Sequence, residues 1–399
     1  MKVSQIYAIV NAMSQEYLGK TDIVNEDLTG IVDFGDQIQN LGLLDNYVKS
    51  LIDHIGKVVF VDRPYQGSVP SVLMDGWEYG AIMEKIAMDE YPKAQENDTW
   101  NLQNGKSYDP NVFNQPKASA KFFNKRSTFE IPISLAEKQV KSAFSNAQQL
   151  NSFFSMINTA IETSMTIKLD SLVMSTINSM SAATIKNAET TPTPRAVNLL
   201  TLYNTRFTKT LTVAQAIQDP AFLRWASFYM GIYVKRLSKL STLFNVGGKE
   251  RFTSADRLHI VLLDEFVKAS EAYLQSDTYH ENFVKLPNAE TVPYWQGSGT
   301  DYDFESTSSI NVKYQPSQDS ASAPPAAVTV EQSGILGVMF DRDALGVSNL
   351  DRRTTTNYNP RGEFFNNWYK FDAGYFNDLN ENFVVFYVED AGSGDVSGK

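Results

Sequence analysis

Apolar positions along this 399-residue chain change their spacing at definite points, and these changes predict strands and helices. The most regular pattern covers residues 145–180, where apolar side chains recur every three or four residues. Its members are Leu150, Phe153, Phe154, Ile157, Ile161, Met165, Leu169, Leu172, Val173, Ile177 and Met180. This spacing predicts one helix from Ser145 to Met180, about 50 Å long at about 1.5 Å per residue, whose apolar stripe packs against a core.

The segment before this helix, Asp75 to Pro132, is polar, contains scattered aromatic residues and has no sizeable apolar block. Apolar and polar residues roughly alternate over Trp77–Tyr91 and again over Ala118–Ile133, on either side of a polar stretch at 95–114. Two such limbs predict a long antiparallel hairpin, with a disordered polar loop as the alternative. Both the hairpin and the long helix therefore have the character of segments that contact something outside themselves.

Charges divide between the two limbs of this predicted hairpin. Residues 75–109 contain eight acidic residues and three lysines, whereas residues 117–126 contain four basic residues and no acidic one. Opposite charges facing each other across paired strands stabilise the pairing by about 0.2 to 1 kcal/mol per pair. We therefore predict an acidic outgoing limb facing a basic returning limb.

The rest of the chain predicts a mixture of helices and strands. Residues 1–57 have little core of their own and are predicted to form an arm, with a strand to follow at Lys57–Asp62. Ser134 and Glu137 match a capping box, which predicts that a helix begins at Ser134. Further predicted elements are helical segments at Ala196–Tyr203, Val213–Ile217 and Ala221–Phe244, strands at Leu258–Leu263 and Ile335–Phe340, and a helix at Glu265–Gln275 capped by Asp264.

Composition excludes several classes of protein. The chain has no cysteine, which excludes disulfides and thiolate metal sites, and no apolar stretch long enough to span a membrane. The net charge of −11 argues against binding of nucleic acid by neutralisation of its phosphates. Eight basic residues nevertheless fall between Leu200 and Arg251. They form either a solvated face or a surface that faces nucleic acid or an acidic segment of a neighbour.

The sequence offers no constellation typical of catalysis. Gly19-Lys20-Thr21 lacks the earlier glycine that a phosphate-binding loop needs. The three histidines, His54, His259 and His280, do not pair at metal-binding spacing. His280 with Glu281 is the best general-base candidate, and a structural role is the alternative. We expect no catalytic, cofactor or metal site.

The end of the chain resembles a known family. Gly334–Val347 reads GILGVMFDRDALGV, and Asn359–Asp390 reads NPRGEFFNNWYKFDAGYFNDLNENFVVFYVED. An apolar strand followed by Asp-Arg, then Arg-Gly with aromatic strands, resembles the major capsid proteins of tailed bacteriophages with the Hong Kong 97-like fold. The order of arm, charged hairpin, long helix and mixed lobe is similar to theirs too.

This resemblance implies an α+β fold whose parts follow the chain in a set order. They are an N-terminal arm at 1–57, a strand and connection of the peripheral domain at 58–74, an extended loop formed by a β-hairpin at 75–133, the peripheral domain with its spine helix at 134–190, an axial domain at 191–349, strands returning to the peripheral domain at 350–390, and a C-terminal tail at 391–399.

The resemblance also implies a function. The chain is expected to assemble with itself into pentamers and hexamers of an icosahedral shell around double-stranded DNA, with portal and separate scaffolding proteins as partners and assembly in the host cytoplasm. Expected inter-subunit contacts are Trp77, Glu84, Glu90, Trp100, Lys121 and Lys125. Lys235, Arg236 and Lys239 are the expected inner-surface residues that contact DNA weakly.

Other interpretations stay open at this point. An encapsulin-like shell that holds cargo enzymes is the alternative within the fold, and a soluble hydrolase acting around Asp264 and His280 is the alternative from another class. Some relatives join a loop lysine to a neighbour's asparagine. Lys85, Lys93 and Lys121 lie in the loop, and Asn357 and Asn359 lie downstream, but no feature supports that reaction, so we expect no crosslink.

Overall fold

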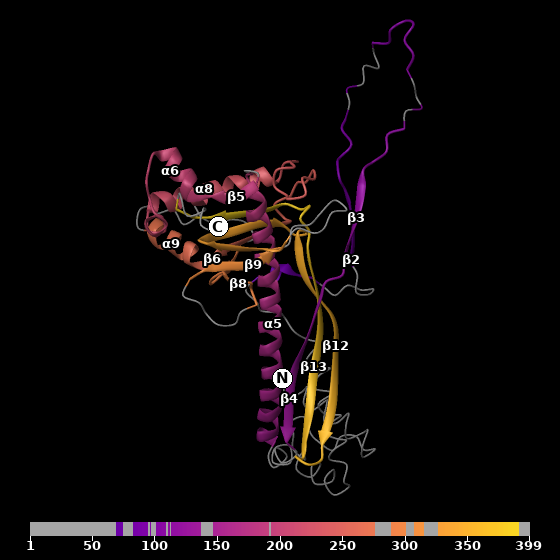
Figure 1. Cartoon of the computed structure of the whole chain (residues 1–399), viewed down its shortest axis with the longest axis vertical. Helices are drawn as coiled ribbons and strands as arrows, with labels where there is room; N and C mark the ends of the chain where they lie inside the picture. The colour runs from indigo at the N-terminus through magenta and orange to yellow at the C-terminus, as the bar shows by residue number, and fades with distance from the viewer. Residues whose placement is uncertain are drawn as a thin grey trace.

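The computed structural model combines a long helix, a long sheet, a mixed lobe and a protruding hairpin (Figure 1). It describes residues 69–74, 83–94, 96, 101–108, 111, 113–136, 147–190, 193–275, 289–300, 307–314 and 326–390. The arm predicted at 1–57 and the strand predicted at Lys57–Asp62 lie outside the described residues. The α+β prediction is confirmed, because the described chain contains both helices and strands and most of its strand pairs are antiparallel.

The long helix α5 spans Ala147–Thr190 and is therefore about 66 Å long at about 1.5 Å per residue. The predicted apolar stripe is buried wherever its side chains are described, from Ile157 to Met180. The helix continues ten residues beyond the predicted end at Met180, up to the Pro192–Pro194 region. Apolar periodicity fades there because the last turns bury small and polar side chains, including Ser181 and Thr184.

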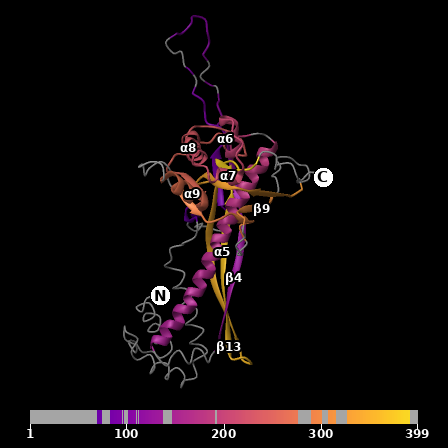
Figure 2. The same cartoon turned by 90° about the vertical axis from the view of Figure 1, so that its left-hand side faces the viewer.

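The long sheet has the strand order β1-β12-β13-β4. These strands are β1 at Leu73–Met74, β12 at Leu345–Asn359, β13 at Phe364–Asn377 and β4 at Arg126–Ala136. Antiparallel pairing of β13 with both β12 and β4 continues along most of their length. The helix α5 runs beside this sheet in both views (Figures 1 and 2).

A five-stranded sheet forms the centre of the mixed lobe, in the order β5-β14-β11-β6-β7. Its strands are β5 at Ala196–Asn198, β14 at Phe383–Tyr387, β11 at Ile335–Asp341, β6 at Leu258–Leu263 and β7 at Ala289–Val292. The predicted strands at Leu258–Leu263 and Ile335–Phe340 are confirmed as β6 and β11. Their near-continuous apolar runs are buried on both faces.

Helices cover this central sheet. They are α6 at Leu199–Phe207, α7 at Val213–Ala216, α8 at Pro220–Leu237 and α9 at Asp264–Gln275. Asn198 caps α6 by accepting the Thr201 N–H at 3.1 Å, and Asp219 caps α8 by accepting the Ala221 N–H at 2.8 Å. The helix expected after β6 is confirmed as α9.

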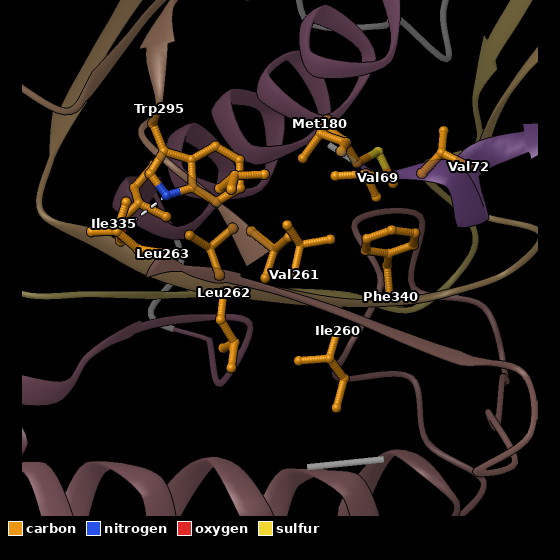
Figure 3. Close-up of a cluster of buried hydrophobic side chains, with 14 of the residues drawn as sticks. Val69, Val72, Met180, Ile260, Val261, Leu262, Leu263, Trp295, Ile335 and Phe340 are labelled. Carbon is orange, nitrogen blue, oxygen red and sulfur yellow. Dashed lines mark hydrogen bonds between the residues drawn. The ribbon is translucent and has the colours of Figure 1, made fainter. Parts of the chain in front are cut away.

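Buried side chains cover both faces of the central sheet: Val261 and Leu263 face α5, whereas Ile260 and Leu262 face the helical layer on the other side (Figure 3). Val69 precedes a short 3₁₀ turn (Pro70–Val72) and Val72 ends it, and both bring an earlier part of the chain against Met180 and Phe340. Trp295 is fully buried and donates its indole N–H to the Ile335 carbonyl at 3.0 Å. A small three-stranded sheet follows this tryptophan in the chain. Its strands are β8 at Gln296–Gly297, β9 at Ser309–Tyr314 and β10 at Val328–Ser333.

The Asp-Arg turn of the C-terminal motif ends β11 in the core. Asp341 is 3% exposed and accepts the Thr253 hydroxyl at 2.7 Å and the Asp343 N–H at 3.0 Å. The Asn382 amide donates to the same Thr253 oxygen at 3.1 Å. The turn between β11 and β12 is thereby joined to the start of β14, which explains why an acidic residue follows an apolar strand here.

Several local predictions need correction. The helix predicted at Ala196–Tyr203 begins only at Leu199, because Ala196–Asn198 pairs with β14 as β5, and the helix predicted at Ala221–Phe244 ends at Leu237. Ser134 lies in β4 rather than at the start of a helix, because its strand pairs with β13 opposite Asn366 and its hydroxyl bonds that side chain at 2.6 Å. The returning limb predicted at Ala118–Ile133 is divided between two sheets. Only β3 at Ala118–Phe123 pairs with β2 at Met83–Met88, whereas β4 joins the long sheet. The strand β14 completes the central sheet rather than the long one.

Candidate functional site

The protruding hairpin, residues 83–123, extends away from the rest of the molecule (Figure 1). Its strands β2 and β3 pair antiparallel from Met83↔Phe123 to Met88↔Ala118. Every described residue from 101 to 108 is exposed. Three large side chains toward the tip are mostly exposed, with Leu102 at 68%, Tyr108 at 56% and Phe113 at 84%. This part of the hairpin has no core within the described chain.

Lys85 on β2 fastens the base of the hairpin to the turn between β13 and β14. Its ammonium group donates to Asp378 Oδ2 at 2.8 Å, to Glu381 Oε1 at 2.8 Å and to the Asp343 carbonyl at 3.1 Å. Three acceptors satisfy all three donors of a lysine. The side chains of Asp378 and Glu381 are 3% and 10% exposed, so these contacts are shielded from water.

Lys121 on β3 binds the other oxygen of the same carboxylate, with 3.0 Å between its Nζ and Asp378 Oδ1. Burial alone would raise the pKa of Asp378, but Lys85 and then Lys121 outweigh burial and hold that pKa below its ordinary value. Asp378 is therefore ionised at neutral pH. One buried carboxylate binds both limbs of the protruding hairpin.

Arg251 completes this arrangement from the segment after α8. Its Nε lies 3.1 Å from Glu381 Oε1, and its guanidinium donates to the Met88 carbonyl, at the end of β2, at 2.6 Å. We call Lys85, Lys121, Arg251, Asp378 and Glu381 the ionic clamp. Its members come from four separate stretches of the chain, so it joins the hairpin to the mixed lobe.

Further contacts continue outward from the ionic clamp. Asp89 accepts the Ser119 hydroxyl at 2.8 Å and pairs with Lys249 at 3.1 Å. The hydrogen bond from Ser119, followed by that from Lys249, lowers the pKa of Asp89. The Tyr91 N–H donates to Glu250 Oε2 at 2.9 Å, and the Tyr91 ring lies 6.0 Å from that of Phe252.

The predicted inter-subunit residues lie in different settings. Glu84 and Lys125 are exposed, and Glu90 pairs with Lys117 at 3.1 Å within the hairpin. Lys121 is 38% exposed and belongs to the ionic clamp of its own chain. Trp77 and Trp100 lie outside the described residues. Whether these residues contact another subunit stays a prediction.

The charge pattern predicted for the hairpin is wrong at its base. Glu90 and Lys117 do pair, but Lys85 lies directly opposite Lys121, and Glu84 lies opposite Phe122. The carboxylates that neutralise the two lysines come from Asp378 and Glu381, far along the chain. Sequence reasoning missed these acids because an ion pair between residues nearly 300 positions apart has no local pattern. The dense polar run Asn377–Asn382 between two apolar strands is the signal that could have indicated them.

The three predicted basic residues Lys235, Arg236 and Lys239 are exposed at the C-terminal end of α8. The Arg236 guanidinium lies over the rings of Tyr229 and Tyr233, at 5.7 and 5.2 Å from their centres. Cations at the end of a helix also interact favourably with its dipole. The structure therefore gives Arg236 a packing role against the two tyrosine rings and leaves the charges of all three residues accessible.

The described residues contain no group of three metal-binding side chains, and none of their helices is long and apolar enough to cross a membrane. Asp264 begins α9, whereas His280, the other half of the hydrolase interpretation, lies outside the described residues. The ionic clamp, whose carboxylates are nearly buried, consists of three cations and two carboxylates and contains no nucleophile paired with a base.

A family model described as Phi29-like phage major capsid protein matches residues 6–387. A search of curated proteins found no match. The similar solved structures include the capsid of Staphylococcus phage Andhra, at 10% identity and a TM-score of 0.48, covering 82% of this chain and 86% of that one. A second is the structure of head fiber and inner core protein gp22 of native bacteriophage P68, at 8% identity and a TM-score of 0.46, covering 83% and 86%.

A third is the capsid of Cyanophage P-SCSP1u, at 10% identity and a TM-score of 0.42, covering 83% of this chain and 91% of that one. These scores are too low to carry an argument about the details of this chain. The family model covers nearly all of the chain, and the assignment of the chain to a family rests on this match alone.

Proposed function

Because the chain belongs to the Phi29-like phage major capsid protein family, we propose that it assembles into pentamers and hexamers that form an icosahedral shell around double-stranded DNA. Family membership makes it a structural protein of the virion rather than an enzyme. It also favours a phage capsid over the encapsulin-like shell and the soluble hydrolase. The observation that carries the mode of assembly is the protruding hairpin, which exposes large apolar side chains far from any core of its own.

The protruding hairpin lies across a neighbouring copy in this proposal. Leu102, Tyr108 and Phe113 together leave a large apolar area in water, and each such side chain gains about 1.5 to 3 kcal/mol when it is fully buried. Subunits of a closed shell are the partners that bury such a surface on every copy. Trp77, Glu84, Glu90, Trp100 and Lys125 are the proposed neighbouring contacts, with Lys121 positioned by the ionic clamp.

Other partners follow from the same function. Portal and scaffolding proteins are the proposed partners in assembly, which takes place in the host cytoplasm. The DNA contact is weak and independent of sequence, since the net charge of −11 opposes strong attraction to phosphate. Lys235, Arg236 and Lys239 are the proposed inner-surface contacts.

The test of this function removes the tip of the hairpin. Deletion of Glu96–Asn114 should leave the fold of the subunit intact, because the described residues there are exposed, and should abolish shells seen by electron microscopy. A gentler variant changes Leu102, Tyr108 and Phe113 to Ser and keeps the length of the loop. Its matched control changes Gln103, Asn104 and Ser107, which are exposed and polar, to Ala.

We expect shells from the control and none, or malformed ones, from the apolar-to-Ser variant. Circular dichroism and thermal melting should be the same for both. Normal shells from the deletion variant would overturn the proposed role of the hairpin.

A further inference from the structure

The base of the protruding hairpin contains a repulsive pair. Lys85 and Lys121 are directly opposite each other in the β2-β3 ladder. Directly opposite side chains lie about 4.5 to 5.5 Å apart at their Cβ atoms, and like charges at that separation destabilise the pairing. The same face of the ladder carries Met83, Ala87, Ser119 and Phe123, and so supplies no carboxylate. Within the paired positions of the ladder the repulsion is uncompensated, and Asp89, the next residue on this face, binds Ser119 and Lys249 instead.

Compensation comes from the body of the molecule. Asp378 binds Lys85 with one oxygen at 2.8 Å and Lys121 with the other at 3.0 Å. Glu381 binds Lys85 and Arg251. Because the carboxylates are almost fully buried, solvent and salt screen these contacts weakly. The lysine pair is therefore stabilising when the hairpin is docked and destabilising when it is not.

A two-stranded ribbon has little stability of its own, and at least a third strand or a packed face is normally needed. The β2-β3 ribbon forms a sheet of two strands, and in the described structure its side chains are half-buried or exposed. Its other attachments include the Met88 carbonyl bound by Arg251, the Phe123 ring, 5.2 Å from that of Phe376, and, just beyond β2, the pair of Asp89 with Lys249. The contacts that neutralise the two lysines thus serve docking and strand pairing at once.

We propose that the base of the protruding hairpin is a two-state element, in which β2 pairs with β3 only while Asp378 holds Lys85 and Lys121 together. Asp378 is a positioning residue: it determines whether the hairpin projects as an ordered ribbon or is released as two unpaired segments. The effect of this two-state element on assembly rests on the role proposed above for the protruding hairpin. While the base of the hairpin is docked, a shell subunit presents the hairpin in one fixed direction. When the base is released, the hairpin can take another direction.

The test measures hydrogen exchange of the β2 and β3 backbone amides in the unassembled full-length subunit. Asp378→Asn keeps the size of the side chain and an acceptor for the Asn380 N–H, but removes the charge. We expect exchange in β2 and β3 to become about tenfold faster or more, because removing one partner of a buried ion pair is strongly destabilising. Exchange in the buried strands β6 and β11 should stay slow.

The decisive variant is Lys121→Met, made in two backgrounds. In Asp378→Asn protein it removes the repulsion and should slow exchange in β2 and β3 again. In the wild-type protein it removes a favourable contact and should give no such protection. A role in packing alone would predict effects of the same sign in both backgrounds. Lys117→Met, which removes an exposed lysine paired with Glu90 of the same hairpin, is the matched control and should not rescue.

The outcomes separate this proposal from the proposed function. Unchanged exchange in Asp378→Asn, or no reversal by Lys121→Met, overturns the two-state element whatever happens to assembly. Normal shells after deletion of Glu96–Asn114 overturn the assembly role and leave the exchange results standing. If Asp378→Asn does not fold, Glu381→Gln removes the other carboxylate bound by Lys85: exchange in β2 and β3 should become faster, and unchanged exchange in that variant overturns the two-state element.

Discussion

His259 shows how a single side chain in the central sheet makes stability depend on pH. Its ring lies 5.7 Å from that of Phe340, and its Nε2 is buried without a hydrogen-bond partner in the described structure. Burial lowers the pKa of His259, with a further contribution from Arg342, although the charges of Glu290 and Asp341 oppose it. The histidine is therefore neutral in the folded subunit at pH 7.

A base with a lowered pKa stabilises the fold above its unfolded pKa, about 6.5, and loses that stability as pH falls toward the folded pKa. Urea unfolding should therefore show a decline in stability between about pH 7 and pH 5 that is smaller in His259→Phe. Parallel declines in both proteins would contradict this assignment.

Gly299 allows two backbones to approach closely. Its φ is +88°, and a Cβ there would lie 2.3 Å from the backbone nitrogen of Ser175 on α5. Gly299→Ala should cost more than about 2 kcal/mol in the free energy of unfolding, because left-handed strain and a backbone clash add. Gly248→Ala is the matched control, since Gly248 also has a positive φ, +63°, but has open space around it. Its cost should be about 1 kcal/mol, measured by the same urea titration.

Among the elements, the helix α5 was predictable from the sequence, whereas the strand β4 was predicted only as far as Ile133 and not over its last residues. The stripe from Ile157 to Met180 has helical spacing because one face of α5 packs along its length, and every described member is buried. At Ser134 a local capping pattern predicted a helix, but pairing with β13 determines the conformation there. A capping box contributes about 1 kcal/mol, whereas β4 gains backbone hydrogen bonds with β13 along its full length.

The two faces of α5 give a direct test of that stripe. Ile177 is fully buried, whereas Ile167 on the same helix is 47% exposed. Ile177→Ala should lower the free energy of unfolding by about 2 to 5 kcal/mol, and Ile167→Ala by less than about 1 kcal/mol. Chemical denaturation of the unassembled subunit measures both. Similar losses for the two variants would mean that the helix is packed on both faces.

At the scale of the whole molecule, the sequence indicated the order of the parts but not how they are joined. Periodicity reports which side of α5 is apolar, and near-continuous apolar runs mark β6 and β11 as buried strands, so local signals were sufficient for these three elements. The ionic clamp depends on Asp378 and Glu381 meeting a hairpin that precedes them by about 250 to 300 residues, and a single sequence carries no signal for such a meeting. For the same reason, the sequence alone predicted a hairpin with an acidic limb facing a basic limb, although Lys85 in fact lies opposite Lys121.

The net charge of −11 and the basic residues at the C-terminal end of α8 together lead to a prediction about how the assembled particle holds DNA. Changing Lys235 and Lys239 to Gln and Arg236 to Met removes three exposed positive charges, while Met keeps apolar contact with Tyr229 and Tyr233. If these residues face packaged DNA, the variant particles should lose DNA at lower salt than wild type, since each phosphate contact that is removed reduces the salt dependence of binding by about one unit.

The control for this experiment is Lys117→Gln together with Lys268→Gln, two exposed lysines outside the end of α8. DNA retention across a salt series, measured on purified particles, should be unchanged by the control. Unchanged retention in the α8 variant would show that these three charges serve the helix end and the tyrosine rings alone. Weak contact of this kind is what an acidic shell requires, because strong attraction along the whole inner surface would oppose the movement of DNA during packaging and release.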